Sequence, residues 1–142
     1  MRTTVLAAFL VTSVLGCGSQ TKIEECNALV GVINTGVEKV QKGVSATPDG
    51  GAAVGELRSL ADELEAIAGE AAKLKLTLPE LTKFSGDYQT MAKNVATAAR
   101  ELADAVDNVD VEKMSEAQTR METAVKQEDP LVEQINKFCL VP

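Results

Sequence analysis

Apolar residues in this chain recur at alternating steps of three and four, the spacing that places side chains on one face of an α-helix. The first such stripe predicts a helix that runs to Val44. Most of its members are β-branched, which lowers their intrinsic helix propensity, so this helix should depend on tertiary contacts. The stripe consists of Ile23, Cys26, Val30, Ile33, Val37, Val40 and Val44.

A loop is predicted next, because the segment SATPDGG at 45–51 contains a proline and two glycines. A second stripe then extends to Leu78. The motif TLPE predicts the start of a further helix, with Thr77 as cap, Pro79 in the first turn and Glu80 at the capping-box position. The second stripe is Ala53, Leu57, Leu60, Leu64, Ile67, Ala71, Leu74 and Leu78.

A third stripe keeps the phase of the second across Leu78 and Leu81, so a single long helix bent at the proline is an alternative that leaves three helices. At DNVD, 107–110, the phase changes, which predicts a tight turn with Asn108 or Asp110 as the next cap. The third stripe is Leu81, Phe84, Tyr88, Met91, Val95, Ala98, Leu102, Ala105 and Val109.

The fourth stripe is less regular, because the polar residues Gln118 and Glu128 occupy two of its positions. They would line a polar pocket or a partner groove, or else the helix is rotated so that a neighbouring row of apolar residues turns inward, which we favour. Pro130 should kink or restart this helix. The stripe is Val111, Met114, Gln118, Met121, Val125, Glu128, Val132, Ile135 and Cys139, and the neighbouring row is Ala117, Ala124, Leu131 and Phe138.

The four stripes together predict an all-α fold. Alanine, leucine, valine, glutamate and lysine dominate the composition, which favours helices, and no β-hairpin motif competes. We expect one domain over residues 22–142, an antiparallel up-down-up-down four-helix bundle.

The first sixteen residues have the composition of a signal peptide. Arg2 precedes an uncharged, largely apolar run from Thr3 to Leu15, and Gly16 precedes Cys17. The sequence VLGC, Val14 to Cys17, resembles the lipobox of bacterial lipoproteins. The resemblance implies that 1–16 are removed, that Cys17 receives a diacylglyceryl group, and that 17–21 form a short lipidated tether. An ordinary secretory signal with a chance cysteine is the alternative.

The resemblance also implies a location in the cell envelope, held to a membrane by acyl chains such as palmitate. An aspartate directly after the lipidated cysteine resembles the inner-membrane retention signal, and this chain has Gly18 at that position. We therefore expect the protein at the outer membrane, facing the periplasm or the exterior. The chain after the signal has 13 basic and 21 acidic residues, a net charge of −8. This charge disfavours nucleic acid and provides no basic patch for anionic lipid headgroups.

Two further cysteines, Cys26 and Cys139, lie near the start of the first helix and at the end of the last. These ends meet in a four-helix antiparallel bundle but are far apart in a three-helix one. An exported chain enters a compartment that permits disulfides, and lipidation of Cys17 leaves an even number of cysteines. We therefore predict a Cys26–Cys139 disulfide; the alternative is two buried thiols.

The chain offers few residues for a catalytic or metal-binding site, since it has no histidine. We expect no catalytic residues, no cofactor and no metal site. Met91, Met114 and Met121 would form a copper(I) site if they faced one another. Methionines at helical spacing are more typical of a hydrophobic core. The acidic pairs Glu24 and Glu25, Glu63 and Glu65, and Asp104 and Asp107 are typical of a solvated surface.

These features predict a membrane-anchored envelope lipoprotein, not an enzyme, whose helical bundle binds an envelope protein or plays a structural role. The alternative is a carrier or sensor that holds a small apolar ligand or lipid between its helices, in a space left by Ala71, Ala98 and Ala105. An exposed apolar stripe would favour a protein partner, and an enclosed apolar cavity would favour a ligand.

Overall fold

The computed structural model describes residues 17–45 and 54–140, with side chains from 20 to 39 and from 54 to 140. The predicted signal peptide, and the predicted 45–51 loop after its first residue, lie outside these described residues. The same holds for the stripe position Ala53 and for the side chains of Val40 and Val44. The described elements are α1 (Cys17–Ser45), α2 (Val54–Ala72), α3 (Pro79–Asp107), α4 (Val111–Val125) and α5 (Glu128–Leu140).

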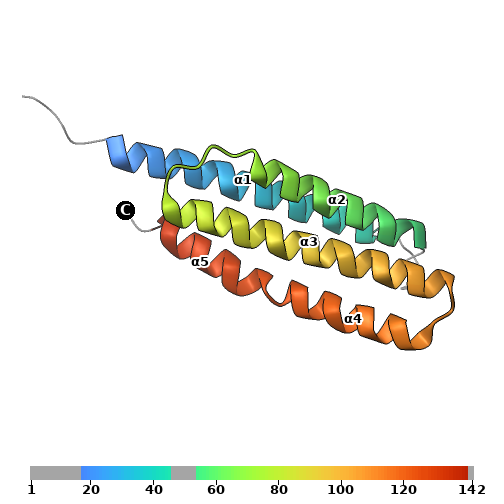
Figure 1. The fold of residues 1–142 in the computed structure, drawn as a ribbon. Coiled ribbons are helices and arrows are strands. Elements are labelled where there is room, and N and C mark those ends of the chain that lie inside the picture. Colours follow the sequence, from blue (N-terminus) through green and yellow to red (C-terminus); the bar gives the residue numbers. More distant parts are fainter. Residues whose placement is uncertain (1–16, 46–53, 141–142) are drawn as a thin grey trace, which may run out of the picture.

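The five helices form four antiparallel rods, which confirms the predicted all-α bundle (Figure 1). The fourth rod consists of α4 and α5, which follow one another along α3. The helix restarts at Glu128 as predicted, with Pro130 in the first turn of α5. Proline is tolerated there because the first turn of a helix leaves its amide hydrogens unbonded.

The segment between α2 and α3 differs from the predicted helix. The second stripe suggested helix up to Leu78, whereas α2 ends at Ala72 and residues 74–77 have no regular secondary structure. The sequence KLKLTL, 73–78, in fact alternates: Leu74, Leu76 and Leu78 are partly buried against the core, and the intervening residues are exposed. Leu74 and Leu78 are four apart, so they fit a helical period as well as an extended one.

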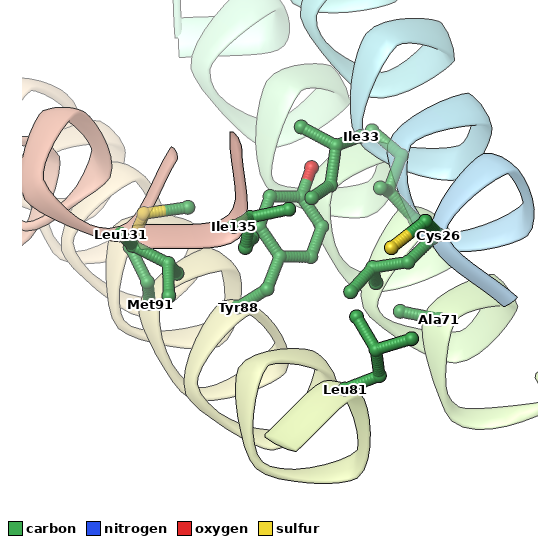
Figure 2. Close-up of a cluster of buried hydrophobic side chains, with 10 residues drawn as sticks. Cys26, Ile33, Ala71, Leu81, Tyr88, Met91, Leu131 and Ile135 are labelled. Atoms are coloured by element: carbon green, nitrogen blue, oxygen red, sulfur yellow. The ribbon is translucent and has the colours of Figure 1, made fainter. Parts of the chain in front are cut away.

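The packing is unequal at the two ends of the bundle. At the end where α1 begins, helices α1, α2, α3 and α5 pack around one cluster, and the ring of Tyr88 lies among Ile33, Leu81 and Ile135 (Figure 2). At the other end, α4 packs against α3, and within the described residues it has no comparable packing with α1 or α2. We call these the disulfide end and the far end.

Alanines form most of the second cluster, which lies between α2, α3 and α4. Ala61, Ala68, Ala92, Ala96 and Ala99 are each fully buried. Their small side chains let the α2 and α3 backbones approach closely, and the space is filled by Leu64 and Val95. None of these five alanines belongs to a predicted stripe.

The inward faces are also rotated from the predicted stripes in α1 and α4. In α1, Leu29 is fully buried while Ile23 is 59% exposed. In α4 the alternative that we favoured, a rotated helix with the neighbouring apolar row turned inward, is confirmed, since Ala117 and Ala124 are buried. Val111 and Val125, predicted to face the core, are 73% and 46% exposed. The prediction of the fourth stripe as a core face is therefore wrong over α4.

Gly36 allows α1 to pack against this core, and its substitution provides a test. A Cβ atom built on Gly36 would lie 2.8 Å from the Tyr88 hydroxyl and 2.9 Å from Cγ2 of Ile67. Both atoms belong to rigid side chains, so Gly36→Ala should destabilise the fold by about 1–3 kcal/mol. Gly31→Ala meets nothing within 4 Å and should gain about 0.5–1 kcal/mol from helix propensity.

The two variants should thus move the midpoint of urea unfolding in opposite directions. A stabilising effect of Gly36→Ala would show that α1 does not pack on α2 and α3 at this distance.

Candidate functional site

Cys17, the predicted lipidation residue, is the first residue of α1. The segment predicted as a short lipidated tether, 17–21, is helical, so it advances only about 1.5 Å per residue. A lipid on Cys17 would therefore join a helix that continues directly into the bundle. The structure describes the backbone of Cys17 but not its side chain.

Cys26 and Cys139 are brought together at the disulfide end. Their sulfurs are bonded at 2.08 Å, the Cα atoms are 5.8 Å apart, and 113 positions separate the residues in the sequence. The bond links α1 to α5 two to three turns after Cys17. It holds the C-terminal helix beside the predicted anchor.

Partly exposed apolar groups surround the disulfide. The rings of Phe84 and Phe138 meet edge to face with centroids 6.0 Å apart, and the Lys22 ammonium lies 4.6 Å from the Phe138 centroid. Ile23 and Leu140 are 59% and 82% exposed on the same rim of the bundle. These contacts connect α1, α3 and α5 around the covalent link.

Glu25 was predicted to be a surface residue, and this was wrong. It is only 7% exposed. Its carboxylate accepts hydrogen bonds from the Thr77 hydroxyl, from the Thr77 N–H at 2.9 Å and from the Leu78 N–H at 3.1 Å. Its neighbour Glu24 is exposed. For two adjacent glutamates, the sequence does not indicate which side chain turns inward.

Thr77 was predicted to cap α3, which is also incorrect. The N-cap is Leu78, whose side chain makes no capping hydrogen bond. The Thr77 hydroxyl donates to Glu25 instead. Glu25 of α1 thus adds a second negative charge near the start of α3, beside Glu80 in its first turn, and this charge also interacts favourably with the dipole of α3.

Two pKa shifts show where charge is disfavoured in the core. Burial, with a smaller contribution from the Glu128 charge, raises the pKa of Tyr88 to about 12. Burial and the nearby Asp129 raise the pKa of Glu128. By contrast, the hydrogen bond from the Thr77 hydroxyl holds the pKa of Glu25 below its usual value, despite burial.

The other candidate residues do not assemble into a chemical site. Met91 belongs to the cluster at the disulfide end, whereas Met121 packs on the alanine-rich cluster. Asp104 and Asp107 are both bound by Arg58, at 3.0 and 2.7 Å. Within the described residues, no group of three or more acidic or cysteine side chains has the arrangement of a metal site.

The described grooves are open to solvent. One, of about 490 Å³, runs between α1 and α2 beside Gly31 and Ile67. Two others, of about 330 and 280 Å³, lie between α3 and α4. Ala98 and Ala105 border these two separately, and Ala71 packs in the core at the disulfide end. The three alanines proposed to leave a common space therefore do not share one.

The largest unpacked apolar surface of α4 is its predicted stripe. Val111 and Val125 are well exposed, Gln118 is exposed, and Met114 and Met121 are partly buried. Gln118 therefore does not line an internal pocket. Glu128 is partly buried at the start of α5, near Tyr88.

No family model matches this chain, and neither does any curated protein or solved structure. Among the described helices, none combines the length and apolarity that a membrane span requires. The site must therefore be interpreted from its own residues.

The disulfide should make a large contribution to stability. Closing a loop over 113 positions removes on the order of 5 kcal/mol of unfolded-state entropy. Reducing the signal-less domain, or changing both residues to serine, should lower the free energy of unfolding by about this amount. Urea denaturation with and without dithiothreitol measures it.

The Cys26→Ser/Cys139→Ser variant provides the control, because dithiothreitol should leave its unfolding curve unchanged. A wild-type curve that is insensitive to the reductant would contradict the bond between α1 and α5.

Glu25 should contribute stability that depends on pH. Its pKa is lowered in the folded state from 4.5, so its stabilising effect is complete above that pH and is lost as the pH falls through the folded value. Glu25→Gln should lower the thermal midpoint at pH 7, and this deficit should shrink as the pH falls below 4.5.

Glu24→Gln removes the same charge from the exposed neighbour and should change stability by less than about 0.5 kcal/mol. Circular dichroism melts of the three proteins between pH 3 and 7 provide the comparison. A deficit of Glu25→Gln that is constant with pH would refute the role of the carboxylate charge.

Proposed function

We propose that this protein is a membrane-anchored envelope lipoprotein whose helical bundle binds another protein. The anchor rests on the resemblance of VLGC to a lipobox and on the apolar run before it. The start of α1 at Cys17 is compatible with an anchor joined directly to the bundle.

The observation that supports binding is the exposed apolar face of α4. Soluble helices normally pack such a stripe against a neighbour, and an unpacked stripe is typical of a protein interaction surface. Val111 and Val125 are 73% and 46% exposed. This face of α4, formed by Val111, Met114, Gln118, Met121 and Val125, is thus the best-supported binding surface among the described residues.

The carrier alternative has less support. A ligand-binding pocket usually encloses most of its ligand between apolar walls. The grooves described above are open, and polar residues such as Thr97, Glu101 and Arg120 line the larger of the two described between α3 and α4. We also propose a location at the outer membrane, on the basis of Gly18.

The anchor can be tested in cells with an alkyne analogue of palmitate. The wild-type protein should incorporate the label and sediment with membranes, whereas Cys17→Ser should lose the label and remain in the soluble fraction or retain its signal peptide. Electrophoresis after click chemistry measures the label.

The Cys26→Ser/Cys139→Ser variant is a matched control that should keep the label, because the two cysteines that it lacks are bonded to each other in the wild-type protein and should not accept lipid. Labelling that persists in Cys17→Ser would overturn the anchor.

A further inference from the structure

The disulfide end exposes apolar side chains on two helices. Ile23 of α1 is 59% exposed, and Leu140 of α5 is 82% exposed. Ile23 lies one turn before Cys26, and Leu140 directly follows Cys139. The bond between these cysteines holds their Cα atoms 5.8 Å apart, so the two exposed side chains belong to one surface. We call this surface, formed by Ile23, Phe138 and Leu140, the disulfide rim.

Phe138 extends the apolar surface of the rim toward α3. Its partly buried ring lies 6.0 Å from the Phe84 ring, centroid to centroid, and the Lys22 ammonium lies 4.6 Å from the Phe138 centroid. A lysine in this position keeps its charge in water while its methylene groups lie along an apolar surface. Phenylalanine and leucine beside lysine are the side chains with which amphipathic helices bind at the lipid–water boundary.

Helix α1 connects the rim directly to Cys17. Six residues separate Ile23 from Cys17, which is about 9 Å along a helix. The headgroup layer of one leaflet is about 5–8 Å thick. Figure 1 shows that α5 ends at the same end of the bundle at which α1 begins. A lipid on Cys17 would therefore hold the rim within reach of the bilayer surface, whatever the tilt of α1.

The charges at this end do not favour one sign of headgroup. Lys73 and Lys83 form ion pairs within their own segments, with Glu70 and Asp87. The other charged side chains nearest this end are three lysines and three glutamates: Lys22, Lys75, Lys137, Glu24, Glu25 and Glu80. Contact with a membrane would therefore depend on the apolar side chains of the rim, not on anionic lipid.

We propose that the disulfide rim rests in the headgroup layer of the membrane that holds the lipid anchor, with Ile23 and Leu140 in contact with lipid. The inference rests on the proposed anchor at Cys17 and adds the orientation of the bundle. Because the anchor would keep the rim at the bilayer, a weak apolar attraction suffices to hold it there. The disulfide contributes by keeping Leu140 of α5 beside α1.

Tryptophan fluorescence can test this contact, because the chain has no tryptophan of its own. The full-length protein, purified from membranes, is placed in phosphatidylcholine vesicles with or without brominated acyl chains, which quench tryptophan within the bilayer. Ile23→Trp and Leu140→Trp report on the rim. Val109→Trp and Val111→Trp are matched controls, because these positions are also apolar and exposed, by 77% and 73%, but lie at the far end.

Brominated lipid should quench the two rim variants and shift their emission to shorter wavelength. The far-end variants should stay unquenched, since the 29 residues of α3 place them about 40 Å away. Adding Ile23→Asn to Leu140→Trp should reduce its quenching by about twofold or more, because an apolar contact is lost. Adding Val109→Asn instead should leave the quenching unchanged, and so should adding phosphatidylglycerol to the vesicles.

Equal quenching at the two ends, or none at the rim, would overturn the contact. Quenching that appears only with phosphatidylglycerol would also overturn it, because an electrostatic attraction would then hold the protein. The mass of the purified protein separates the two proposals. An acylated chain with an unquenched rim refutes only the rim contact, whereas a chain without acyl groups refutes the anchor and the inference that rests on it.

Discussion

The covalent link between Cys26 and Cys139 is the constraint on which this architecture depends. It joins the start of the first helix to the end of the last, so the four rods must close at that end. The Tyr88-centred cluster, the Phe84–Phe138 contact and the Glu25 hydrogen bonds all lie near this link. Together they bring α1, α3 and α5 into contact near Cys17, the proposed site of the lipid anchor.

The far end lacks an equivalent constraint. There α2 and α3 pack closely through alanines, and α4 is held by Ala117 and Ala124 on the surface of α3. Alanine contacts bring backbones together but bury little apolar surface per residue. The ion pairs from Arg58 and Arg100 link α2 to α3 but not to α4. As a result, Val111 and Val125 remain exposed on α4.

This asymmetry suggests a division of labour along the molecule. The disulfide end would face the membrane and fix the orientation of the bundle, because α1 is helical from Cys17 onward. The far end would then project away from the bilayer with its exposed valines, Val109 and Val111. A rigid connection of this kind presents one surface at a defined distance from the membrane, which a flexible tether would not do.

The sequence by itself determined the helical class, a kink or restart of the last helix at Pro130, and a cap at Asn108 or Asp110, because these depend on local periodicity and backbone chemistry. In the structure the cap is Asp110 and the last helix restarts at Glu128. It also paired Cys26 with Cys139, since a four-helix topology brings those ends together. It could not separate helical from alternating spacing in 73–78, where leucines fit both periods. Nor could it distinguish Glu25 from Glu24, and it left the buried face of α4 as a choice between two alternatives. Only the tertiary structure decided these, because the face a helix buries depends on which neighbours reach it.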